Sequence, residues 1–154
     1  WRLGMTLLGV GYGTADQPLG PATLRAAGQR VELLRQMPTR GSVTEWYVNR
    51  PNGLEQGFTL SEAPGERRAG EPLTLSLELS EGWRAAVEPD GQSARLSSTG
   101  GVHLQYDKLL VTDAAGRQLE ARMATAGDGT VRLEVVDEGA QYPVTIDPTF
   151  TQQA

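Results

Sequence analysis

The sequence contains no cysteine and a single histidine, His103, among its 154 residues. Disulfide bonds, thiol catalysis and cysteine-based zinc sites are therefore excluded. A zinc site needs three or four ligands, usually nitrogen or sulfur, and one histidine does not supply them. A Ser-His-Asp triad would require the same histidine as its base, and the sequence has no Gly-x-Ser-x-Gly motif. His103 lies on the polar side of an expected strand, so we interpret it as a surface residue.

Long apolar runs are also missing, and the only dense basic cluster, Glu66-Arg67-Arg68, lies in a turn-rich stretch. No segment approaches the roughly 20 apolar residues that a membrane-spanning helix needs. The net charge is −5, whereas proteins that bind nucleic acid usually carry a basic patch. The sequence therefore predicts no membrane span and no nucleic-acid partner. It begins at Trp1 without a signal segment, and we expect it to be part of a longer polypeptide whose signal would lie upstream.

The pattern that dominates the sequence is hydrophobic alternation with a period of two, which is typical of half-buried β-strands. Leu73, Leu75, Leu77 and Leu79 alternate with polar residues, and Val131, Leu133 and Val135 do the same. Further strands are expected at Trp1–Leu8, Arg30–Arg35, Val43–Asn49, Leu54–Leu60, Trp83–Val87, Ala94–Ser97, Val102–Tyr106, Lys108–Asp113, Leu119–Met123 and Tyr142–Asp147.

Turn residues separate these strands. Asn52-Gly53, Asp90-Gly91 and Asp128-Gly129 favour the positive φ angles of tight hairpins. The one helix candidate is Pro21–Ala27, with glycines on both sides. About a dozen short strands at this spacing predict an all-β, antiparallel, jelly-roll-like β-sandwich. We expect one domain over residues 1–148, ended by Asp147-Pro148, and a linker over residues 149–154.

Carboxylates offer two kinds of chemistry. Glu45 and Glu55 flank an expected hairpin, and a facing pair of acids about 5–10 Å apart can hydrolyse glycosides. The simpler interpretation is two separate strand carboxylates, so we predict no enzyme activity. Calcium is the one cofactor alternative, because several aspartates lie near turns. These are Asp90, Asp107, Asp113, Asp128, Asp137 and Asp147. They lack the spacing of a calcium loop, and turn formation explains them as well.

Four aromatic residues are candidates for a ligand or interface surface. Trp46 and Tyr47 are adjacent, so on a strand their side chains point to opposite faces. One of the pair is expected in the core, while the other is either buried as well or exposed as a platform for a sugar or a protein. Trp83 and Tyr12 are the remaining candidates.

Two stretches carry a resemblance to a known group of proteins. The first is Glu45–Leu60, which reads EWYVNRPNGLEQGFTL, and the second runs from Tyr106–Leu119 to the closing AQYPVTIDP of Ala140–Pro148. Together they resemble the N-terminal β-domain that precedes FG-GAP (integrin-α-like) or related β-propeller repeats in large bacterial surface proteins, common in myxobacteria. The resemblance implies a β-sandwich, export to the cell surface or medium, and a multidomain parent. It implies no enzyme activity and no cofactor.

Three hypotheses for function remain. The first is a non-catalytic structural or interaction module of a bacterial cell-surface or secreted protein, whose partners are neighbouring domains or other surface proteins. The second is a carbohydrate-binding module that uses one of the four aromatic residues on a glycan. The third is self-association, in which the N-terminal strand Trp1–Leu8 adds to a neighbouring copy.

Overall fold

The computed structural model describes residues 3–13, 18–51, 53–127 and 129–152. These residues form twelve β-strands and no helix, which confirms the all-β prediction. The strands are β1 (Met5–Tyr12), β2 (Thr23–Ala27), β3 (Arg30–Gln36), β4 (Ser42–Arg50), β5 (Gly53–Leu60), β6 (Leu73–Leu79), β7 (Trp83–Val87), β8 (Ala94–Ser98), β9 (His103–Thr112), β10 (Ala121–Thr125), β11 (Thr130–Val135) and β12 (Val144–Gln152). The described part of the chain therefore has no helix long and apolar enough to cross a membrane.

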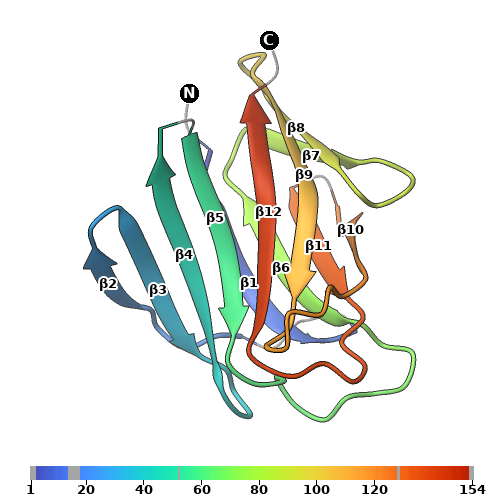
Figure 1. Cartoon of the computed structure of the whole chain (residues 1–154). Coiled ribbons are helices and arrows are strands. Elements are labelled where there is room, and N and C mark those ends of the chain that lie inside the picture. Colours follow the sequence, from blue (N-terminus) through green and yellow to red (C-terminus); the bar gives the residue numbers. More distant parts are fainter. Residues whose placement is uncertain (1–2, 14–17, 52, 128, 153–154) are drawn as a thin grey trace.

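The strands form two antiparallel sheets that face each other (Figure 1). The smaller sheet has the order β1-β6-β11-β10, and the larger has the order β2-β3-β4-β5-β12-β9-β8-β7. The final strand, β12, thus lies in the middle of the larger sheet, between β5 and β9. The β-sandwich is as predicted, but its strand order is not that of a jelly roll, whose eight strands form two Greek keys.

The core lies between the two sheets. Strand pairing sets Val131 opposite Leu77 and Leu133 opposite Leu75, so these residues share one face of the smaller sheet. All four are fully buried, as is Phe58 on the facing sheet. Replacing one such leucine by alanine costs about 2–5 kcal/mol, so this packing supplies much of the stability of the fold.

Residues 21–27, expected as a short helix, instead contain strand β2. Thr23–Ala27 pairs with β3, from Thr23 opposite Leu34 to Ala27 opposite Arg30. Leu24, Arg25, Ala26 and Ala27 favour helix, but an isolated helix of two turns is unstable in water. Gly28, at φ +60°, instead closes a two-residue hairpin turn, and pairing with β3 decides the structure.

Two further strand boundaries differ from the expectation. Lys108, at φ 51°, forms a bulge inside β9, so two expected strands are one continuous strand. Across from the bulge, the register of β12 shifts between Asp147 and Thr149, and the strand continues through Pro148 to Gln152. The predicted strand end at Pro148 was wrong, because a proline opposite a bulge interrupts no ladder hydrogen bond. The expected linker is therefore strand as far as Gln152.

Several predicted turns and ends are only partly covered. Asp90-Gly91 forms a turn with Gly91 at φ +71°. Asn52 and Asp128, in the two other predicted Asn/Asp-Gly turns, lie outside the described residues, as does Trp1 of the first predicted strand. Tyr142-Pro143, a cis peptide bond, directly precedes β12, as expected for a proline at a strand start.

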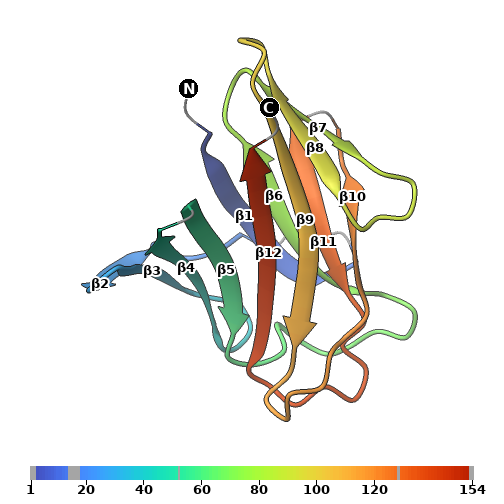
Figure 2. The same ribbon diagram turned by 45° about the horizontal axis from the view of Figure 1, so that its top comes forward.

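The larger sheet extends beyond the smaller sheet on one side. There β2, β3 and β4, together residues 23–50, lie beyond β1 and form what we call the wing (Figure 2). Every residue of β2 is exposed, and β3 is at most half-buried. Strand β5 pairs with β12 only over Phe58–Leu60, and the two strands separate toward Gly53. The sandwich is therefore open on the side of the wing.

Candidate functional site

The inner face of the wing carries an uncovered row of apolar side chains. Pairing sets Leu24 beside Leu33, and Ala26 beside Val31, on the same face as the core residue Phe58. The second sheet does not reach them, so Leu24 is 67% exposed and Val31 is 37% exposed. We call these four residues the apolar strip. An apolar row continuous with a core and left open to solvent is typical of an interaction surface.

A polar cluster lies between the apolar strip and the core. Glu45 is 2% exposed and accepts hydrogen bonds from Arg35 Nη1 at 3.3 Å, Gln56 Nε2 at 3.3 Å and the Tyr47 hydroxyl. Gln56 Nε2 also donates to the Tyr47 hydroxyl at 3.2 Å. Burial, and then the hydrogen bond to Glu45, raise the pKa of Tyr47 above its usual range. The Arg35 guanidinium compensates the negative charge of Glu45, so the polar cluster borders the core without an unpaired charge.

Trp46 lies on the other face of the wing, as the alternation with Tyr47 predicts. Its indole is 6% exposed, with the Arg30 guanidinium 4.8 Å above the ring centroid. On the side of Gly57, a Cβ atom would stand 2.0 Å from Trp46 Cζ2, so only glycine leaves room for the ring. The indole Nε1 donates to Thr59 Oγ1 at 3.2 Å. The protein itself therefore encloses this indole.

The other aromatic candidates are held away from one another. Trp83 is 7% exposed and belongs to the core. Tyr47 is half-buried in the polar cluster, and Tyr12 is half-buried at the end of β1. The structure therefore brings no two of the four together on one exposed surface.

The two glutamates considered for hydrolysis do not face each other. Glu45 stands opposite Phe58, and Glu55 stands opposite Val48. Because side chains alternate along a strand, Glu45 points to the inner face of the sheet and Glu55 to the outer face. His103 is exposed, with Nδ1 3.1 Å from Ser97 Oγ, as expected of a surface residue.

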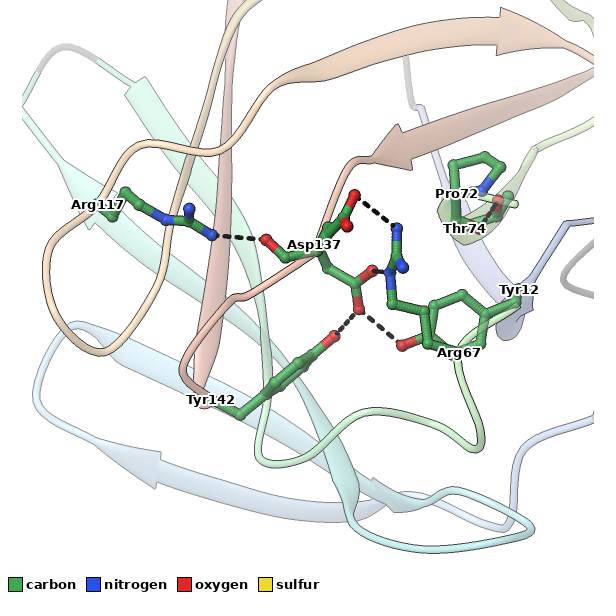
Figure 3. A network of polar contacts seen from close by, with 8 residues as sticks. Tyr12, Arg67, Pro72, Thr74, Arg117, Asp137 and Tyr142 are labelled. Atoms are coloured by element: carbon green, nitrogen blue, oxygen red, sulfur yellow. Dashed lines mark hydrogen bonds and ion pairs between the residues drawn. The ribbon is translucent and has the colours of Figure 1, made fainter. Parts of the chain in front are cut away.

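Asp137 joins its own loop, between β11 and β12, to the end of β1 and to the loop between β5 and β6 at one end of the sandwich (Figure 3). It is 4% exposed, and its Oδ2 accepts hydrogen bonds from the hydroxyls of Tyr12 at 2.6 Å and Tyr142 at 2.7 Å. Its Oδ1 accepts one from Arg67 Nε at 3.3 Å. Burial is the largest cause that raises the pKa of both tyrosines. Three hydrogen bonds thus satisfy the Asp137 carboxylate, and the bond from Tyr12 gives this tyrosine a structural role.

Asp113 shows the turn role that its sequence position indicates. Its Oδ1 accepts hydrogen bonds from the backbone N–H groups of Ala115 at 3.0 Å and Arg117 at 2.9 Å. Its Oδ2 accepts one from Gln141 N at 3.1 Å. These bonds, the one from Gln141 first, lower the pKa of Asp113. Its oxygens therefore organise two loops.

A cleft of about 630 Å³ lies on the outer side, where β5 and β12 separate. Glu55, which forms an ion pair with Arg50, and Asp147 both line it, as does the bulged Lys108. Burial, and then the neighbouring Glu55, raise the pKa of Asp147 to about 6. The nearness of Glu55 and Asp147 was not predicted from the sequence, because Asp147 was expected to end a strand.

Comparison of the chain with protein-family models, curated proteins and solved structures gave no match. The resemblance to domains that precede FG-GAP repeats therefore remains a prediction.

Proposed function

We propose that the chain is a non-catalytic interaction module of a secreted or cell-surface bacterial protein. In this proposal the open side of the sandwich is the surface that it presents to a neighbouring domain or to another surface protein. The observation that carries the proposal is the apolar strip, with Leu24 67% exposed and Val31 37% exposed on a face continuous with the core. The resemblance of Glu45–Leu60 and Ala140–Pro148 to domains of bacterial surface proteins supports the proposed setting.

The structure favours this hypothesis over self-assembly through the N-terminal strand. Strand β1 is paired with β6 of its own sheet from Met5 to Tyr12. Only the other side of β1 is open to pairing with a second copy, and the backbone bridge between Gly9 and Pro18 occupies part of that side. The carbohydrate hypothesis gains no support from Trp46 or Trp83, because both indoles are buried.

Site-specific photocrosslinking tests the proposal. A photoreactive phenylalanine analogue is placed at Leu24, at Val31, or at the control position Val136, which is 45% exposed and lies outside the wing. The variants are expressed in the natural protein in its own cells. We expect one discrete crosslinked partner from positions 24 and 31, reproduced with purified components, and none from position 136. Equal yields at all three positions, or no crosslink at any, would refute the proposal.

A further inference from the structure

Strand β2 is one of the two edge strands of the larger sheet, at the opposite end from β7. Ala27 and Arg30 close the two-residue turn, so they form a hydrogen-bonded pair, and the pairs of Arg25 and Thr23 with β3 are of the same kind. Between them, Leu24 and Ala26 direct their backbone N–H and C=O groups away from β3. Two donors and two acceptors therefore point out of the sheet at the spacing of a strand ladder.

Two other edges, those of β10 and β1, are covered or partly occupied in the described part of the chain. At β10, Met123 N donates to Gly91 O at 2.6 Å, and Gln92 Nε2 donates to Ala121 O at 3.1 Å. The loop that follows β7 thus crosses the edge of β10. Strand β2 has no such cover, because all five residues are exposed, and its pairing with β3 has no bulge or proline. Among the features that discourage strand addition, a bulge, a proline and a covering loop are missing, whereas β2 is short and carries the charge of Arg25.

The wing carries positive charge on a negatively charged protein. Residues 23–50 contain five arginines and two glutamates, whereas the net charge of the chain is −5. Both glutamates are engaged, Glu32 by Arg30 at 3.5 Å and Glu45 by Arg35 at 3.3 Å. Arg25, at the centre of β2, stands opposite Glu32 of β3 but forms no ion pair among the described residues. The edge strand therefore presents a cation, whose cross-strand acid already pairs with Arg30, beside its free backbone groups.

From these observations we infer that β2 binds an extended acidic segment of a partner protein as a ninth strand of the larger sheet. This inference rests on the proposed function. In an antiparallel alignment, the residue opposite Arg25 lies on the outer face and is acidic. The residues on either side of it face Leu24 and Ala26 on the inner face and are apolar. The segment thus has the order apolar, acidic, apolar, and its apolar side chains extend the apolar strip.

A second copy of the chain fits this edge less well. A two-fold pairing of β2 with itself, centred on the strand, sets Arg25 directly against its own equivalent. Like charges directly opposite each other destabilise a strand pair. A partner with an acid at this position gains an attraction instead, which is why we assign the site to a different protein.

The test uses the whole chain and a fluorescein-labelled peptide, Ser-Thr-Val-Glu-Val-Thr-Ser, with a matched peptide in which lysine replaces glutamate. Fluorescence polarisation measures binding, and amide chemical shifts locate it. We expect the glutamate peptide to bind about tenfold more tightly than the lysine peptide, since attraction is replaced by repulsion at one position. We expect the amide chemical shifts that change on peptide binding to be centred on β2. Arg25→Glu reverses the preference between the two peptides.

Ala26→Pro removes one of the two outward N–H donors at an edge position that tolerates proline. Ala26→Val retains the donor and is the matched control, and the amide spectrum of each variant verifies folding. Loss of binding in the proline variant alone supports strand addition. Equal binding by both variants overturns it, as does equal binding of both peptides to the natural chain.

Two results separate this inference from the proposed function. Failure of both peptides to bind at millimolar concentration, with crosslinking at Leu24 retained, overturns strand addition and leaves the interaction module standing. Concentration-dependent dimerisation in light scattering that Ala26→Pro abolishes assigns the edge to a second copy and overturns the acidic partner. Loss of crosslinking with peptide binding intact refutes the wider function only.

Discussion

All four tyrosines of the chain have raised pKa values, and this predicts how the protein responds to alkaline pH. Burial is the largest cause at Tyr12, Tyr47, Tyr106 and Tyr142. The next cause is the hydrogen bond to Asp137 at Tyr12 and Tyr142. An unfolded phenol ionises near pH 10. We therefore expect the folded protein to keep its phenols protonated at a pH where the unfolded chain loses those protons.

The sign of the effect follows from proton linkage. Above pH 10 the unfolded state binds fewer protons than the folded state, so the free energy of unfolding falls as the pH rises. Each protected tyrosine removes about 1.4 kcal/mol per pH unit. If only the fully buried Tyr106 stays protonated, the free energy of unfolding falls by about 1.4 kcal/mol per pH unit. If all four tyrosines stay protonated, it falls by about 5 kcal/mol per pH unit. Tyr12 contributes less than a full share, because it is only half-buried and solvent screens it.

The assay is a spectrophotometric titration of tyrosinate absorbance at about 295 nm, followed in parallel by near-ultraviolet circular dichroism. A domain of ordinary stability, about 5–15 kcal/mol, should lose its fold within a few pH units above 10. We expect the absorbance to rise steeply and together with the loss of the circular dichroism signal. A gradual rise from pH 9 to 11 with the signal intact would refute the reasoning, because it would show phenols ionising in the folded state.

Four substitutions give further predictions. At Asp147, whose folded pKa of about 6 lies above the usual 3.8, stability is lost as pH rises through that interval. Asp147→Asn should therefore stabilise the protein by about 1 kcal/mol at pH 7.5, after allowance for solvent screening, and by nothing at pH 3.5 in urea unfolding. Tyr142→Phe removes a bond to a buried carboxylate and should cost about 1.5–3 kcal/mol, whereas Tyr106→Phe removes a buried hydroxyl with no partner among the described residues and should be neutral or stabilising. Equal losses for the two tyrosine variants in the same urea assay would contradict this difference. Gly57→Ala sets a Cβ atom 2.0 Å from the Trp46 ring, and a loss of about 1–3 kcal/mol with a shifted tryptophan emission is expected; unchanged emission would show that the ring has other room.

The core strands were predictable because their pattern is local. Alternation at Leu73–Leu79 and Val131–Val135 indicates strands that are buried on one face, and these became β6 and β11. Residues 21–27 were mispredicted because their helical preference is local, whereas the pairing of β2 with β3 depends on the hairpin register. The bulge at Lys108 likewise depends on the partner strand and has no signal in its own sequence.

The candidate site was predictable only in part, because it depends on which strands lie side by side. The opposite orientation of Glu45 and Glu55 follows once Arg50 is known to pair with Gly53, since that turn fixes the register. Glu45 also stands two residues after the core residue Val43, which is a sequence sign of a buried acid. The exposure of the wing has no such sign, because it results from one sheet being wider than the other.

The position of β12 has a consequence for how the protein is made. Without β12, the larger sheet consists of two separate pieces, β2–β5 and β7–β9, since β12 supplies the only ladder between β5 and β9 among the described residues. A ribosome releases this strand after all the others, so the sheet closes only when synthesis has passed Gln152. Before that, both pieces expose unpaired edges of the kind that chaperones protect. The same arrangement predicts that residues 1–143 can be completed by a separately supplied peptide that carries the nine residues of β12.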